Sequence, residues 1–237
     1  MNQLQRFKPK RFWHEAQNGF TIVELMIATL VFSVILLVIT FGVIRFSADY
    51  YRGVNSSTTQ NTARGIIDSI TQAIQFSGGI PTQPTANSIC IGNQQLVYNL
   101  GTEITGPSDV GLNQTTNVSC STSPSTANGT ELLGKNMRVT QLKVAEPTNP
   151  DGSLVFNNHT VWNVELSITY GDNDLLCDSS LSPTADGGCN NNHTITDANI
   201  VAAASHGALR CKSVTGSQYC DVVSLSTTVT RRIATGS

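Results

Sequence analysis

The polarity pattern divides the chain into a basic start, a long apolar run, a one-sided continuation and a mixed remainder. The apolar run covers residues 20–44 and holds a single ionisable side chain, Glu24. As a helix it spans roughly 37 Å, which is enough to cross a bilayer core of about 30 Å. A lone carboxylate at the centre of a bilayer costs about 2.5–3.5 kcal/mol on insertion scales. We therefore expect Glu24 to need a partner charge from outside its own segment.

After Arg45 the pattern becomes one-sided. Apolar residues recur at helical spacing and form one stripe, made of Ala63, Ile66, Ile67, Ile70, Ala73 and Ile74. The chain has no proline between Pro9 and Pro81, and the glycines and proline of residues 77–81 are typical of a helix end. The sequence therefore predicts one helix from residue 20 to about residue 76, with its second half buried along the stripe.

The remaining residues, 77–237, alternate in polarity as antiparallel strands do. Residues 162–170 are apolar at every second position, and residues 223–229 predict a last strand. Residues 137–144 alternate with a slip of one residue, which predicts a β-bulge. Residues 89–100 predict a hairpin around Gly92 and Asn93. These strands predict a β-rich head that covers the apolar stripe of the helix.

Two segments between the predicted strands are rich in serine, threonine, asparagine, glycine and aspartate. They cover residues 105–130 and 171–200. We expect both to be long surface loops, stapled by cysteines where these occur.

A short motif at the start of the apolar run resembles a known signal. The motif follows a basic leader and reads Gly19-Phe20-Thr21-Ile22-Val23-Glu24. It resembles the class III signal of type IV pilins and of the pseudopilins of type II secretion and DNA-uptake machines. The resemblance implies that a prepilin peptidase cuts between Gly19 and Phe20 and that the new Phe20 amine is methylated. It also implies that Glu24 pairs with the methylated amine of a neighbouring subunit.

The resemblance implies an α+β, pilin-like fold in four parts. Residues 1–19 would be the cleaved leader, residues 20–44 a transmembrane or filament-core helix, and residues 45–76 its amphipathic half. Residues 77–237 would form a disulfide-containing head of antiparallel sheet, packed on this helical spine. The implied partners are the prepilin peptidase, other major and minor pilins through the helix, the membrane and, indirectly, an assembly ATPase and a platform protein.

The layout is similar to that of minor pilins of the W type and J-type pseudopilins, which help to initiate or cap filament assembly. An alternative is a cell-surface adhesin or other binding protein that is anchored by a pilin stem. A plain signal anchor explains the apolar run but neither Gly19 nor Glu24, and a cleavable secretory signal has a shorter apolar core. The sequence leaves open whether the machine is a pilus, a secretion pseudopilus or a DNA-uptake filament.

Charge predicts the orientation of the apolar segment. Residues 1–19 hold four basic side chains against one acidic one, and 10 basic and 15 acidic residues follow. Positive-inside bias places the N-terminus in the cytoplasm and the head outside the inner membrane, from where it reaches a surface pilus or pseudopilus. The acidic balance of the head argues against nucleic-acid binding.

All six cysteines lie in the head, and an even count outside the cytoplasm predicts disulfides. Several pairings are possible, and we favour the local one. It joins Cys90 to Cys120, Cys177 to Cys189 and Cys211 to Cys220.

The sequence predicts neither an enzyme nor a cofactor. Ser205 and His206 are adjacent, but no nucleophile-elbow pattern surrounds them, and His159 is expected only to lead into a strand. Metal binding through cysteine is disfavoured because no Cys-x-x-Cys occurs and the histidines His193 and His206 lack a ligand spacing. Calcium is possible in one loop, through Asp172, Asp174 and Asp178 with Asp186 nearby, although we favour solvated carboxylates because the spacing does not fit an EF-hand loop.

Overall fold

The computed structural model describes residues 19–123, 126, 128–156, 159–180, 189 and 195–232. The chain forms two compact units, of which the first ends at Phe46 and the second begins at Ser47. One helix, α1, runs from Ile22 to Phe76 and contributes to both units. The predicted helix is therefore confirmed, and it stops where the sequence places its end.

In the first unit, every described residue from Gly19 to Phe46 is exposed. This part of α1 passes through Phe41 and Gly42 as a continuous α-helix. It is also the one described helix that is long and apolar enough to cross a membrane.

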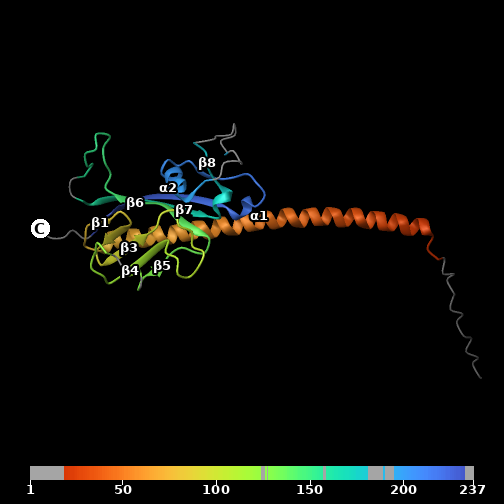
Figure 1. Ribbon diagram of the computed structural model, residues 1–237, viewed down its shortest axis with the longest axis horizontal. Coiled ribbons are helices and arrows are strands. Elements are labelled where there is room, and N and C mark those ends of the chain that lie inside the picture. Colours follow the sequence, from red (N-terminus) through yellow and green to blue (C-terminus); the bar gives the residue numbers. More distant parts are fainter. Residues whose placement is uncertain are drawn as a thin grey trace, which may run out of the picture. The chain divides into compact units, whose positions relative to one another are not determined.

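The second unit buries the predicted stripe of α1 in its main core. All six residues of the stripe are at most 8% exposed, and Thr59 extends the buried face by one turn. Strands of two antiparallel sheets supply the rest of this core (Figure 1). The stripe therefore holds the two sheets together.

The first sheet has five strands in the order β1-β2-β3-β4-β5. Their bounds are Thr82–Thr85, Ser88–Ile91, Gln94–Tyr98, Leu112–Thr116 and Thr130–Glu131. Strands β2 and β3 form the predicted hairpin around Gly92 and Asn93. The expectation of a long loop over residues 105–130 is wrong at β4, where Leu112 is fully buried in the core.

The second sheet has three long strands in the order β10-β7-β6. Their bounds are Asp221–Thr230, Val161–Tyr170 and Met137–Ala145. All three were predicted, and the pairing of β6 with β7 shifts register between Val139 and Gln141, which confirms the predicted bulge. The apolar face of the sheet packs into the core with α1.

Residues 172–220 connect β7 to β10 and build a small second core. Their described elements are η1 (Asn173–Leu175), β8 (Leu176–Asp178), α2 (Asp197–Ser205), β9 (Leu209–Cys211) and η2 (Ser217–Tyr219), and β8 pairs with β9. The expectation of a surface loop over residues 171–200 is therefore wrong at η1, at β8 and at the start of α2, whereas its residues 181–188 and 190–194 lie outside the described part of the chain. Its physical reason is burial, because Leu176, Ile195 and Ile200 are each at most 1% exposed.

Candidate functional site

The first turn of α1 carries the motif residues. Thr21 is the residue before the helix, and Glu24 is three residues later. The Glu24 carboxylate accepts hydrogen bonds from the Thr21 backbone N–H (2.9 Å) and from the Thr21 hydroxyl (3.0 Å), while the Glu24 backbone N–H donates to that hydroxyl (3.2 Å). This reciprocal arrangement is a capping box, which satisfies N–H groups that have no partner within the helix.

The capping box gives Glu24 a local role that our sequence reading missed. Its signal was present, because a threonine followed three residues later by a glutamate is the pattern of such a cap. The local role does not neutralise the carboxylate, since all its hydrogen bonds among the described residues come from Thr21, which is uncharged.

The following turns of α1 present an almost entirely apolar surface. Their hydroxyl groups are satisfied inside the helix, since Thr29, Ser33 and Thr40 donate to the backbone carbonyls of Met26, Thr29 and Leu36. Such internal bonds remove the cost of placing hydroxyls in an apolar medium. The exposed side chains include Ile27, Leu30, Phe32, Leu37 and Phe41, which are each between 58% and 66% exposed. This surface is suited to lipid or to other apolar helices, and poorly suited to water.

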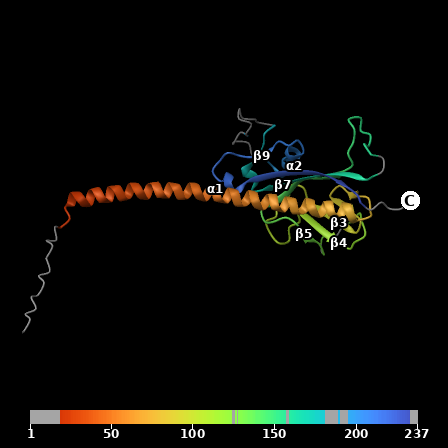
Figure 2. The same ribbon diagram turned by 180° about the vertical axis from the view of Figure 1, so that it is seen from behind.

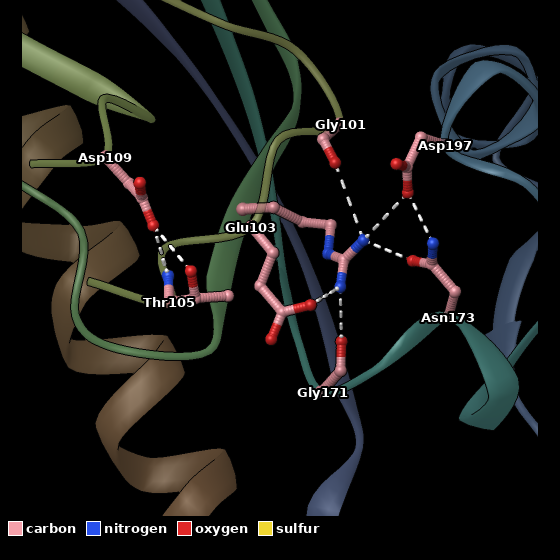
Figure 3. A network of polar contacts seen from close by, with 8 residues as sticks. Gly101, Glu103, Thr105, Asp109, Gly171, Asn173 and Asp197 are labelled. Atoms are coloured by element: carbon pink, nitrogen blue, oxygen red, sulfur yellow. Dashed lines mark hydrogen bonds and ion pairs between the residues drawn. The ribbon is translucent and has the colours of Figure 1, made fainter.

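The head contains one fully buried charged side chain among its described residues, Arg138 on β6 (Figure 3). One of its terminal nitrogens pairs with the Glu103 carboxylate at 2.5 Å and donates to the Gly171 carbonyl at 2.8 Å. The other donates to the Asn173 side chain and to the Gly101 carbonyl at 3.5 Å, and lies 3.5 Å from the Asp197 carboxylate. The guanidinium therefore ties β6 to the loop after β3, to η1 and to α2.

Local chemistry shapes this network. Burial raises the pKa of the Glu103 carboxyl, and the Arg138 guanidinium opposes that rise, while Asp172 and Asp197 add to it. Gly171 has a positive φ of 107°, and a Cβ there would lie 2.4 Å from the Tyr219 carbonyl oxygen. Only glycine therefore fits at the position that offers its carbonyl to Arg138.

Three disulfides staple the head. They join Cys90 to Cys120, Cys177 to Cys189 and Cys211 to Cys220, with Cα atoms 5.8–6.0 Å apart. These are the three pairs that the sequence analysis favoured. Two of the three lie in the segment between β7 and β10, where each joins cysteines that are close in sequence, 12 and 9 residues apart.

The structure does not assemble the calcium candidates. Among the described residues, no group of three or more histidine, cysteine or acidic side chains is placed to hold a metal ion. Asp172 and Asp174 are exposed, whereas Asp178 is buried and accepts hydrogen bonds from the backbone and hydroxyl of Ser180. Asp186 and His193 lie outside the described residues.

The two histidines within the described residues, His159 and His206, have structural partners. His159 contacts the Glu146 carboxylate at 2.6 Å, and its carbonyl accepts a hydrogen bond from the Trp162 indole at the start of β7. His206 lies at the end of α2, where its Nδ1 is 2.8 Å from the Ala202 carbonyl and 3.3 Å from the Ser205 hydroxyl. The imidazole thus contacts a backbone carbonyl in the last turn of its own helix.

The family model of the prokaryotic N-terminal methylation motif matches residues 16–40. Comparisons of the chain with curated proteins and with solved structures found no match. The matched range contains Gly19, Phe20, the capping box and most of the exposed apolar surface of α1. The apolar helix and the motif together indicate a membrane-anchored, single-pass protein. The chain thus carries the class III signal of type IV pilin-like proteins, on a long helix packed against antiparallel sheets in a pilin-like arrangement.

Proposed function

We propose that the chain is a minor pilin or pseudopilin, a structural subunit rather than an enzyme. The observation that carries the proposal is the methylation motif at residues 16–40, which extends into α1. In this part of the helix, up to Phe46, the apolar side chains are exposed on all sides. Prepilin peptidase cuts after Gly19 and methylates the Phe20 amine. The freed helix then enters a filament with other pilins, which an assembly ATPase and a platform protein drive from the cytoplasmic side.

In this proposal the chain first spans the inner membrane, with residues 1–19 in the cytoplasm and the head outside. Residues 20–44 then exchange lipid for the apolar helices of other subunits, and residues 77–237 form the surface-exposed head. The size of the head and its disulfides suit a subunit of the W or J type, which helps to initiate or cap the filament rather than to extend it.

Glu24 supplies the assembly charge. A carboxylate in an apolar filament core is costly without a counter-charge, and the N-methylated Phe20 amine of a neighbouring subunit is a matching cation. The hydrogen bonds from Thr21 leave the negative charge in place, so the capping box orients the carboxylate without replacing its partner. Pairing between subunits would also set their axial register.

A matched set of variants separates assembly from capping. Glu24→Gln keeps a side chain that can complete the capping box but removes the charge, whereas Thr21→Ala removes the cap and keeps the charge. We expect Glu24→Gln to be processed and inserted into the membrane but to be largely missing from purified filaments. Thr21→Ala should enter filaments at close to the wild-type level.

The opposite result, in which Glu24→Gln assembles and Thr21→Ala does not, would make Glu24 a helix cap and remove its role between subunits. Western blots of the membrane and sheared-filament fractions measure both outcomes. Peptidase cleavage in each variant is the control, because an uncleaved variant fails to assemble for a different reason.

A further inference from the structure

One face of the three-stranded sheet is open to solvent. Its other face packs on α1, whereas α2 and the loop that follows β6 rise from the open side (Figures 1 and 2). At the end of this face nearest α2 the side chains are covered, since Arg138 and Thr169 are 1% and 0% exposed. The strands between α2 and the loop are not covered in this way, because Lys143, Ser224, Ser226 and Thr228 are all exposed.

The floor of this open face consists of three rows of side chains that run across the strands. The rows follow from the register and are Gln141-Ser167-Ser224, Lys143-Glu165-Ser226 and Ala145-Asn163-Thr228. Side-chain hydrogen bonds join members of the same row, Ser167 to Ser224 at 2.8 Å and Thr228 to Asn163 at 2.9 Å. Another joins two rows, from Gln141 to Glu165 at 3.2 Å. We call these nine residues the polar floor.

Two hollows lie on the polar floor and meet at Glu165. One has a volume of about 290 Å³ and is bounded by the end of α2 at Ser205 and Gly207. The other has a volume of about 210 Å³ and is bounded by Glu146, Pro147 and Thr148 of the loop after β6. The short side chains of the floor and the taller structures at both ends thus make a concave surface rather than a flat one.

The chemistry of the polar floor narrows the class of ligand. Ala145 is its one apolar member, so it offers no pocket for an apolar anchor side chain of a peptide. Its two charges, Lys143 and Glu165, are neighbours across the strands and cancel, so it does not attract polyanions. The remaining members are hydroxyls and amides, which both donate and accept hydrogen bonds. Neutral ligands with many hydroxyl groups match this set.

We propose that the polar floor binds a neutral saccharide, with one sugar unit in each hollow and Glu165 between them. The Glu165 carboxylate accepts hydrogen bonds from sugar hydroxyls, and the serine, asparagine and glutamine side chains complete the contacts. None of the nine residues is aromatic, so binding relies on hydrogen bonds rather than stacking. The proposal is independent of filament assembly, because the site lies wholly within residues 141–228 of the head.

The test is calorimetric titration of the full chain, held in lipid nanodiscs that contain no sugar detergent. The probes are neutral di- and trisaccharides of glucose, galactose and N-acetylglucosamine, a sulfated trisaccharide, and an unrelated uncharged peptide. Glu165→Gln removes the charged acceptor, and Ser226→Trp fills the larger hollow. Asp68→Asn on the exposed face of α1 and Thr230→Trp at the end of β10 are matched controls, since neither residue lines a hollow on the floor.

We expect at least one neutral saccharide to bind. Glu165→Gln should weaken its binding about tenfold or more, as expected for the loss of a charge-assisted hydrogen bond, and Ser226→Trp should weaken it because the indole occupies the larger hollow. The controls should bind as the wild type does. Absence of binding by every neutral saccharide would overturn the proposal. So would binding of only the sulfated sugar or the peptide, or saccharide binding that the floor variants leave unchanged.

Discussion

The two regions that α1 joins each contain a charged side chain in a largely apolar part of the chain, but the partners of the two charges differ. In the head, Arg138 is enclosed by carboxylates, carbonyls and an amide from four segments of its own chain. In the first half of α1, Glu24 has hydrogen bonds from the uncharged Thr21. The head therefore supplies counter-charges to its buried cation, whereas Glu24 has no charged partner among the described residues of its own chain.

The apolar side chains of α1 differ in the same way. Ile66, Ile70 and Ile74 in the second half are at most 3% exposed, while Ile27, Ile35 and Ile39 in the first half are at least 50% exposed. Burial of one such side chain contributes about 1.5–3 kcal/mol. The second half of α1 gains this energy inside the monomer, and the first half can gain it only from lipid or other subunits.

The largest expected effect comes from breaking the charge network of the head. Arg138→Met leaves Glu103 without its cation and the carbonyls of Gly101 and Gly171 without donors. We expect a loss of about 3–5 kcal/mol in the free energy of unfolding, as for other broken buried ion pairs. Urea denaturation followed by Trp162 fluorescence measures it, since Trp162 is the one tryptophan after residue 19. Arg64→Met on the exposed face of α1 is the control, and an equal loss there would refute a special role for Arg138.

Alanine substitutions on the two halves of α1 sharpen the comparison. Ile70→Ala should lower the free energy of unfolding of the head by about 2–5 kcal/mol because it leaves a cavity in the core. Leu36→Ala, at an exposed position, should change it by less than about 0.5 kcal/mol. The same urea titration measures both variants. If Leu36→Ala destabilised the head as much as Ile70→Ala does, the two halves would not be energetically separate.

The smallest expected effect concerns Asp221, where β10 begins beside α1. Burial raises the pKa of this carboxyl, against opposing contributions from Ser56 and Arg52. A raised pKa means that the folded state favours the protonated carboxyl more than the unfolded state does. The contribution of Asp221 to the free energy of unfolding is therefore fully present at low pH and is lost as the pH rises through the folded-state pKa. The change in the free energy of unfolding that Asp221→Asn causes should therefore be more stabilising, or less destabilising, at pH 7 than at pH 4. The reverse order in urea titrations at the two pH values would show that the ionised carboxylate is the stabilising form.

Much of the fold could be predicted because its signals are local in sequence. The stripe of α1, the alternation of β7 and the slip in β6 each lie within a dozen residues, and two of the three cysteine pairs are only 12 and 9 residues apart. The Thr21–Glu24 cap was equally local, but the apolar surroundings of Glu24 drew attention to its charge alone.

The parts that could not be predicted depend on contacts between distant residues. The partners of Arg138 lie 33–37 residues away at Gly101, Gly171, Asn173 and Glu103, and still farther away at Asp197, so no local pattern marks it. Residues 171–200 looked like a polar loop because serine, threonine, asparagine, glycine and aspartate are frequent there, and the buried Leu176, Ile195 and Ile200 form no periodic pattern. Helix α2 did have a local signal. A run rich in alanine follows Asp197 and ends at Gly207, and glycine is common just after a helix because it adopts the positive φ found there.

The central claim is that residues 16–40 act as a processed signal. The measurement that tests it most directly is the intact mass and N-terminal peptide of the chain, extracted from membranes of cells with and without prepilin peptidase. We predict a chain that begins at N-methylated Phe20 when the peptidase is present and that keeps residues 1–19 when it is absent. A chain that keeps those residues in both cells would contradict the claim and leave α1 as a simple membrane anchor.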